Sequence, residues 1–315
     1  MATICISSAS FPTPALAFRG GGPAETCRVE AFAALQSRAA DGSRRFLLSR
    51  LSAAESSRDR VEVLRRCHRA LSEWRYNVAC EAPGRLGVGL PLDAERFRTS
   101  LRAGGPNFDR VGDLGRLRAG AAWDERSRTF RGGAPTPASE ILRAYGQAAL
   151  ERFAEERAGD VLVNQVVVPS GRLLPGNRLV RGMAAQRVAA ELAERIAARG
   201  GDPNRMEVGG DPVYVVTADP DNADRLFAMA LRLLADAVDL DEDARLQKWQ
   251  QARYLLYQAP QMKKGSDAVT RVFLVAVGAV LLGAAPVLEQ DVDLRCMVLG
   301  QHAATTMPAD LPATR

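Results

Sequence analysis

Apolar side chains recur at intervals of three and four residues through most of the chain, and this is the period of an amphipathic α-helix. The clearest repeat follows the possible caps Ser56 and Ser57 and consists of Val61, Leu64, Cys67, His68 and Leu71. The same period predicts helices within residues 26–74, 93–102, 137–158, 182–201, 219–239, 241–258, 272–288 and 288–301. The pattern therefore predicts a mainly α fold, a helical bundle.

Runs of β-branched residues interrupt the helical pattern in two places. Residues 161–168 and 172–180 flank a Pro-Ser-Gly turn, which is typical of a β-hairpin. Residues 212–218, PVYVVTA, form one more short strand. We therefore expect a small antiparallel β-hairpin or sheet beside the bundle.

Changes in composition and in the apolar pattern divide the chain into four parts. We expect a flexible leader at 1–25, an N-terminal helical and loop-rich region at 26–136, a helical core domain with the β-hairpin at 137–302, and a flexible tail at 303–315. The second boundary rests on the Gly, Arg and Pro residues that are frequent just before Pro137.

Composition narrows the class of protein. The chain has 315 residues, of which 47% are hydrophobic, so it can bury a large core. The net charge of +5 is spread without a polybasic block, and we expect no nucleic-acid partner. The five cysteines contain no CxxC pair and there are two histidines, so no metal site is predicted. Lysine occurs three times, at Lys248, Lys263 and Lys264, and every other basic residue is arginine.

The longest uncharged run extends from Val272 to Leu288 and falls just short of the roughly 20 residues that cross a bilayer. Its Gly and Pro residues and the flanking Arg271 and Glu289 favour a buried core helix, so we expect no membrane partner. The amino terminus lacks the basic start and continuous apolar core of a secretory signal peptide. We expect a cytoplasmic protein, or one that is secreted without a cleaved signal peptide.

The stretch QAPQMKKGSDAVTR, from Gln258 to Arg271, holds the main candidate for a ligand site. A loop that ends in Gly and opens a buried helix presents free backbone N–H groups to an anion. We expect these residues to cradle a phosphate-bearing small molecule: Lys263, Lys264, Gly265, Ser266 and Arg271. Ser266 or Asp267 is also a suitable helix cap, and Arg271 can instead form a salt bridge to Asp267, Asp291 or Asp293.

The helix ending in YLLYQAP, the loop, and the helix GSDAVTRVFLVAVGAVLLGAAPV resemble the core of the Fic/Doc (Fido) nucleotidyl-transferase family. In that family a His-Pro-Phe and Gly-Asn-Gly-Arg loop joins two central helices and holds nucleotide phosphates. Its histidine deprotonates a protein hydroxyl that receives AMP. Pro260 matches the family's proline, Gly265 the first loop glycine, and Arg271 the distal arginine that helps to hold phosphate. The segment Gly283 to Val287 is similar to the end of the family's helix.

The resemblance implies a phosphate- or nucleotide-binding transferase that acts on a hydroxyl of a protein or small molecule, with ATP or another nucleotide as the cofactor. It also implies that the hairpin from Val161 to Val180 is the family's flap, which clamps a target protein by strand addition; plain scaffold is the alternative. Ala259 replaces the histidine, Ser266 and Asp267 replace Asn and Gly, and the loop is one residue longer. The general base is therefore unassigned.

Two other functions stay open. The first is a non-catalytic protein-interaction or exported effector protein whose helical domain binds a partner. The second is a thiol enzyme that joins Cys80 to His68 or His302 and to Asp291 or Asp293. The cluster from Trp74 to Asn77 has the side chains to stack on a planar ligand, although core packing explains it equally.

Overall fold

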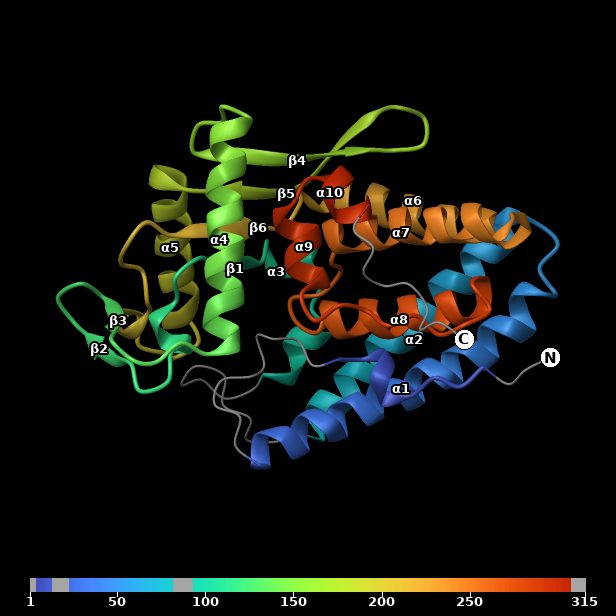
Figure 1. Ribbon diagram of the computed structural model, residues 1–315, viewed down its shortest axis with the longest axis horizontal. Coiled ribbons are helices and arrows are strands. Elements are labelled where there is room, and N and C mark those ends of the chain that lie inside the picture. The colour runs from blue at the N-terminus through green and yellow to red at the C-terminus, as the bar shows by residue number, and fades with distance from the viewer. Residues whose placement is uncertain (1–3, 13–22, 82–92, 307–315) are drawn as a thin grey trace.

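The computed structural model describes residues 4–12, 23–81 and 93–306. Its larger part is a bundle of long helices (Figure 1): α1 (Pro23–Leu51), α2 (Ser57–Cys80), α6 (Pro220–Asp236), α7 (Glu242–Gln258) and α8 (Ser266–Leu281). Helix α8 packs against α1, α2 and α7, while α6 packs against α2 and α7. The mainly α fold predicted from the apolar period is confirmed.

Helix α8 forms the centre of the bundle. Its side chains from Val269 to Ala279 are buried without exception, because neighbouring helices cover it all round. The helix ends two residues before Gly283, which has a left-handed φ of 70°. The long uncharged run is thus a core helix followed by a turn. No helix among the described residues has the length and apolar character that crossing a membrane requires.

A four-stranded antiparallel sheet lies beside the bundle, with the order β1 (Phe108–Val111), β6 (Val213–Val216), β5 (Leu173–Val180) and β4 (Val161–Val167). Helix α4 (Pro137–Glu155) covers one face and α5 (Gly182–Ala197) covers the other (Figure 1). Alternate residues of β6 lie on opposite faces of the sheet: Val213 and Val215 pack towards α4, and Tyr214 and Val216 pack towards α5. The predicted hairpin and third strand are confirmed.

The region between α2 and α4 is more regular than its sequence predicts. It contains a 3₁₀ turn at Ala94–Phe97, the short α3 (Leu101–Gly104), strand β1, and a separate hairpin of β2 (Ala122–Asp124) and β3 (Thr129–Arg131). Strand β1 is not predicted because two of the four residues in its sequence, FDRV, are charged. The strand lies at an edge of the sheet, where charged residues are common. The helix expected at 93–102 is instead the turn followed by α3.

Residues at both expected flexible ends pack against the rest of the chain. Ile6 and Phe11 are buried in the core of the bundle, and the hydroxyl of Ser37 on α1 donates to the carbonyl of Ile6 at 2.8 Å. Two short helices, α9 (Val292–Val298) and α10 (Gln301–Thr306), follow α8, and Ala304 is buried. The core of the bundle also joins α1 and α2 to α6, α7 and α8, so it crosses the boundary expected at residue 136.

A buried network of side-chain amides joins the sheet to the end of α7. The Oε1 of Gln258 accepts a hydrogen bond from the backbone N–H of Asn177 in β5 at 2.8 Å, and its Nε2 donates to the carbonyl of Cys296 in α9. Asn177 donates in turn to the carbonyl of Tyr257 and accepts from the N–H of Ala218. Gly176 leaves room for this network, because a Cβ there would lie 2.4 Å from the Gln258 oxygen. The last turn of α7 is thereby fixed relative to both β5 and α9.

We expect Gln258→Leu to lower the free energy of unfolding by about 2–5 kcal/mol, because it leaves buried donors and acceptors of the backbone unpaired. Urea unfolding followed by circular dichroism measures the loss. The matched control is Gln147→Leu on the exposed face of α4, which we expect to change stability by less than about 0.5 kcal/mol. Equal midpoints for the two variants would contradict this role of the network.

Candidate functional site

The loop between α7 and α8 is held by the segment that precedes β1. Ser100 and Met262 form an antiparallel bridge, the N–H of Leu101 donates to Gln261 at 3.1 Å, and the N–H of Lys263 donates to Thr99 at 2.9 Å. The side chain of Asn107 donates to the carbonyl of Met262. A loop with this many backbone partners has a defined shape before any ligand arrives.

Lys263 extends from this loop towards a tight turn at Gly104–Pro106. Its Nζ donates to the carbonyl oxygens of Gly105 and Pro106 at 2.9 and 2.8 Å, which leaves its third N–H for another acceptor. The Pro106 carbonyl also accepts from Nη1 of Arg195 on α5. Gly104 is packed so closely on the lysine stem that a Cβ would meet its Cδ at 2.7 Å. Two cations from distant segments are thus held together by one turn.

The start of α8 differs from the predicted cap. The Ser266 hydroxyl bonds both the N–H and the carbonyl of Met262, closing the loop, and Asp267 faces Tyr257 and Arg271. The N-cap residue is Gly265, with a φ of 79°, which has no side chain to accept from the first N–H groups of the helix. The positive end of α8 is therefore left without a side-chain cap.

Arg271 lies inside the protein, 1% exposed, and braces the loop from below. Its Nε donates to Asp267 at 2.9 Å, Nη1 to the carbonyl of Glu289 at 2.9 Å, and Nη2 to the carbonyl of Gln290 at 3.0 Å. Nη2 also approaches Asp293 at 3.4 Å. Of the predicted cradle, this residue points away from the loop surface, and most of its donors are satisfied internally.

The two carboxylates beside Arg271 repel each other. Burial and, after it, the charge of Asp267 raise the pKa of Asp293 to about 7, although Arg271 opposes both effects. For Arg271, burial favours the neutral form, but the attraction of Asp267, Tyr257 and Asp293 outweighs it and raises its pKa. The guanidinium therefore keeps its charge and holds α8 to the segment that follows it.

Lys263 and Lys264 lie among arginines that sequence reasoning missed. Arg75 comes from α2, Arg96 from the 3₁₀ turn, and Arg195 and Arg199 from the end of α5 and just beyond it. We name these six residues the cation cluster. Because arginine is abundant throughout the chain, no local signal marks these four, and they come together through folding.

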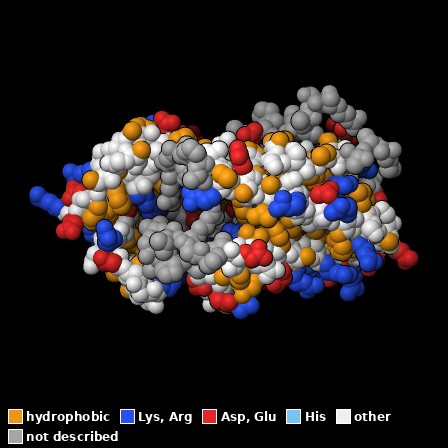
Figure 2. Space-filling model, turned by 90° about the horizontal axis from the view of Figure 1, so that it is seen from below, with side chains coloured by type: hydrophobic (Ala, Val, Ile, Leu, Met, Phe, Trp, Pro, Cys, Tyr) orange, Lys and Arg blue, Asp and Glu red, His pale blue; other side chains and the backbone are white. Residues whose placement is uncertain are grey.

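Aromatic rings support one side of the cation cluster. The guanidinium carbon of Arg75 lies 4.2 Å from the centroid of Phe97, and Nζ of Lys264 lies 5.9 Å from it. Gly265 is packed against the same ring, because a Cβ there would meet Phe97 at 2.7 Å. The side chains of Lys264 and Arg96 make no hydrogen bond or ion pair within the described ranges. Figure 2 shows Lys and Arg side chains spread over the face seen from below, with Asp and Glu side chains among them.

The pKa values record the crowding of positive charge. Burial, and after it the charges of Arg195 and Arg96, lower the pKa of Lys263 to about 8. Burial and Arg96 also lower the pKa of Lys264, and burial and Arg199 that of Arg96. The acids that act on the two lysines are Asp93, Asp109 and Glu191, and Glu191 is paired with Arg195. Positive charge at the cluster thus exceeds its local compensation.

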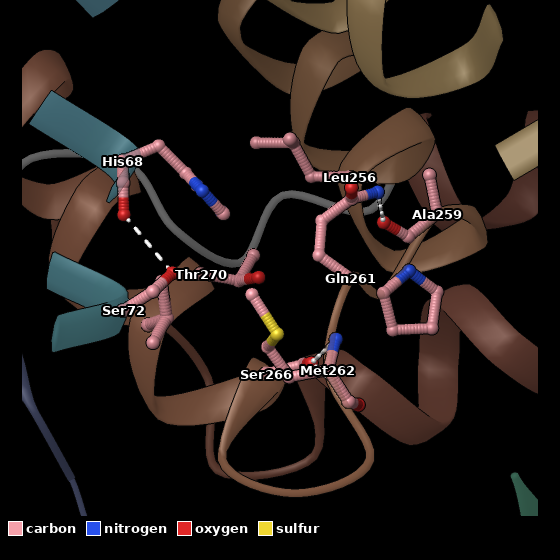
Figure 3. A pocket seen from close by; sticks show the side chains of 10 residues that line it. His68, Ser72, Leu256, Ala259, Gln261, Met262, Ser266 and Thr270 are labelled. Atoms are coloured by element: carbon pink, nitrogen blue, oxygen red, sulfur yellow. Dashed lines mark hydrogen bonds between the residues drawn. The ribbon is translucent and has the colours of Figure 1, made fainter. Parts of the chain in front are cut away.

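A small cavity of about 10 Å³ lies on the inner side of the loop, between α2 and α8 (Figure 3). The imidazole of His68 points into it and packs edge-on against Phe227 and Phe273, with centroids 4.8 and 5.4 Å away. Burial lowers the pKa of His68 to about 4, so the ring is neutral at pH 7. The volume suits about one water molecule, so the cavity has no room for a nucleotide.

Of the residues expected for a thiol enzyme, Asp291 and Asp293 are engaged with other side chains, and Cys80 and His302 are exposed. Cys80 is the last residue of α2 and exposed, whereas His68 lies on the same helix about 18 Å away along its axis. Asp291 accepts a 2.6 Å hydrogen bond from Tyr145, and Asp293 faces Arg271. The structure does not bring Cys80 and His68 together. Within the described ranges, no three His, Cys, Asp or Glu side chains are grouped around a metal position.

The four residues from Trp74 to Asn77 do not share one surface. Trp74 packs against the core of the bundle, and Arg75 belongs to the cation cluster. The Tyr76 hydroxyl donates to Glu95 at 3.1 Å, and Asn77 is exposed. This segment therefore contributes one cation to the site instead of a stacking platform.

The expected flap, the β4–β5 hairpin, lies at an edge of the sheet. Near its tip the side-chain amide of Gln301 bonds both backbone groups of Val167, at 2.7 and 3.0 Å. A segment that added to this part of β4 would have to displace Gln301. The clamping role stays a prediction.

We expect Arg271→Met to lower the free energy of unfolding by about 3–5 kcal/mol at pH 8, since it leaves the carboxylates of Asp267 and Asp293 without their buried cation. The loss should be smaller at pH 5, because an acid whose pKa is raised to about 7 is protonated there. Urea unfolding at both pH values tests this. Arg143→Met, on the exposed face of α4, is the control, and the same small loss in both variants would refute the bracing role.

The geometry carries the functional argument, because neither the family models nor the curated proteins include a match to this chain.

Proposed function

We propose that the chain is a phosphate- or nucleotide-binding transferase of Fido-like type, with the ligand's phosphates held at the cation cluster. The observation that carries the proposal is the gathering of six cations around the α7–α8 loop, where burial first, and the neighbouring arginines after it, lower the pKa values of Lys263, Lys264 and Arg96. A polyanion relieves this repulsion, so its binding is favoured by the charges that destabilise the empty site.

The loop adds directional donors to this charge. The uncapped start of α8 presents backbone N–H groups, and Lys263 has one N–H beyond the two that bond carbonyls. Lys264 and the backbone of Gly265 and Ser266 complete the proposed cradle, since the hydroxyl of Ser266 closes the loop on Met262, and Arg271 supports the cradle from the interior. We add Arg96 to the proposed ligand contacts because it lies in the cation cluster.

The transfer step follows from the resemblance and from the ligand chemistry. An acceptor hydroxyl oxygen would form a bond to a phosphorus atom of the nucleotide, a phosphoanhydride bond would break, and the released phosphates would leave with the electron pair. The hydroxyl proton needs an acceptor. Ala259 supplies none, and the base stays unassigned.

The first test is thermal unfolding with ATP, GTP and pyrophosphate. A ligand at a free concentration of 100 times its Kd stabilises the folded protein by about 2.7 kcal/mol, which raises the midpoint of thermal unfolding measurably. We expect Arg96→Gln/Lys264→Gln to weaken the binding of ATP by at least about tenfold. The control with the same net charge is Arg143→Gln/Arg232→Gln on exposed helix faces. Thermal midpoints that do not shift with any of the three ligands would contradict the proposal. An equal loss of ATP affinity in both double variants would show that the ligand does not bind at the cation cluster.

A label at the α-phosphate of ATP separates catalysis from binding. Transfer of the label to a hydroxyl-bearing acceptor supports the transferase. Saturable binding without transfer to any acceptor favours the non-catalytic interaction protein.

The second prediction concerns pH. An anion restores the pKa of Lys263 from about 8 towards its ordinary value, so binding at pH 8 should take up about half a proton. Affinity should then fall as the pH rises, by up to about tenfold per unit above pH 8. Calorimetry in buffers of different ionisation enthalpy measures the uptake. Lys263→Arg stays charged throughout and should lose this dependence; an unchanged proton uptake in Lys263→Arg would show that another group titrates.

A further inference from the structure

A second concave site lies at the end of the molecule formed by α5 and the β2–β3 hairpin (Figure 1). It is a cleft of about 330 Å³ between α5 and the segment that leads into β6. Ala189, Ala190 and Ala193 line one wall, and Met206, Val208 and Pro212 line the other. A cleft of this size with apolar walls falls within the range of small-molecule sites.

The turn of the β2–β3 hairpin closes one side of the cleft. The carbonyl of Arg128 accepts hydrogen bonds from the N–H groups of Val208 and Gly209, both at 3.2 Å. Gly209 approaches the turn so closely that a Cβ would lie 2.1 Å from the Ser127 oxygen. The turn is therefore docked on the cleft wall, and the position of Arg128 is set by the backbone.

The backbone of Arg128 is strained at this position. Its φ is 51°, in the left-handed region that a residue with a Cβ disfavours and a glycine adopts readily. Its Nη2 donates to the carbonyl of Pro203 at 2.8 Å, and its buried Nε has no hydrogen-bond partner among the described residues. No carboxylate of the described residues forms an ion pair with it. Although Asp211 also lines the cleft, the guanidinium of Arg128 is thus not engaged by a carboxylate there.

The charge of this cleft differs from that of the cation cluster. Asp211 also lines it, so one carboxylate accompanies one guanidinium, and Gln186 adds a neutral amide. A phosphate dianion finds far more positive charge at the cation cluster. A monoanion with an apolar body suits the cleft, because a carboxylate pairs with a guanidinium while the body covers the alanines of α5.

We propose that this cleft is a second ligand site, which binds a small monocarboxylate with an aromatic or branched apolar body through the guanidinium of Arg128. The site is separate from the proposed transferase loop and does not depend on it.

The test is a titration of the full chain by ligand-observed NMR, with 3-phenylpropionate as the probe. We expect saturable binding that is at least about tenfold tighter than that of the uncharged 3-phenylpropionamide. Arg128→Gln should remove this preference. Ala190→Trp should fill the cleft and abolish binding of both compounds. Arg126→Gln, on the exposed part of the same hairpin, is the control and should bind like the wild type.

A glycine variant separates a ligand role from a structural one. Arg128→Gly should fold with a thermal midpoint at or above that of Arg128→Gln, because glycine adopts the left-handed φ without strain, and it should still lose the preference for the acid. The proposal is overturned by equal binding of acid and amide, by no saturation with 3-phenylpropionate, or by unchanged binding in Ala190→Trp. None of these outcomes involves ATP, so they leave the proposed transferase function untouched.

Discussion

The buried charge of Arg271 is the constraint on which the loop and its surroundings depend. A guanidinium inside a helical bundle is stable when carboxylates and carbonyl oxygens surround it. Here Asp267 comes from the first turn of α8, and the carbonyls of Glu289 and Gln290 come from the segment before α9. Tyr257 donates to the same Asp267 from the last turn of α7. Both ends of the α7–α8 loop are therefore tied to one charge beneath it.

This bracing separates the two kinds of cation at the site. Arg271 is paired with Asp267 and contributes rigidity, whereas the side chains of Lys264 and Arg96 are half-buried and form no hydrogen bond or ion pair in the described ranges. Electrostatic energy stored as repulsion at the surface of the loop can persist because the interior network keeps the loop in place. The compensated charge in the interior and the uncompensated charge at the surface are thus two consequences of how the α7–α8 loop is folded.

The sequence predicts much of the fold because periodic burial acts locally. The helices from Pro137 onwards and the strands β4, β5 and β6 follow from the apolar period and from β-branched runs. Strand β1 could not be predicted in this way, because it pairs with the distant strand β6 and its sequence, FDRV, has two charged residues and no apolar alternation that indicates a strand. The candidate site divides in the same way. The loop from Lys263 to Ser266 was visible as a contiguous motif, but Arg96, Arg195 and Arg199 join it through tertiary contacts. The expected helix cap is absent because the side chain of Ser266 bonds to Met262 and that of Asp267 bonds to Tyr257 and Arg271.

The lysine at position 263 also bears on the missing base. With a pKa near 8 its amine is partly neutral around pH 8 in the empty site, which suggests at first a proton acceptor in place of the absent imidazole. A bound phosphate reverses this, because its negative charge stabilises the ammonium and raises the pKa again. In the proposed complex, the interaction that would make Lys263 an anion ligand would therefore also keep it protonated. The proton acceptor of the proposed transfer would then have to come from another part of the complex, such as the acceptor molecule itself.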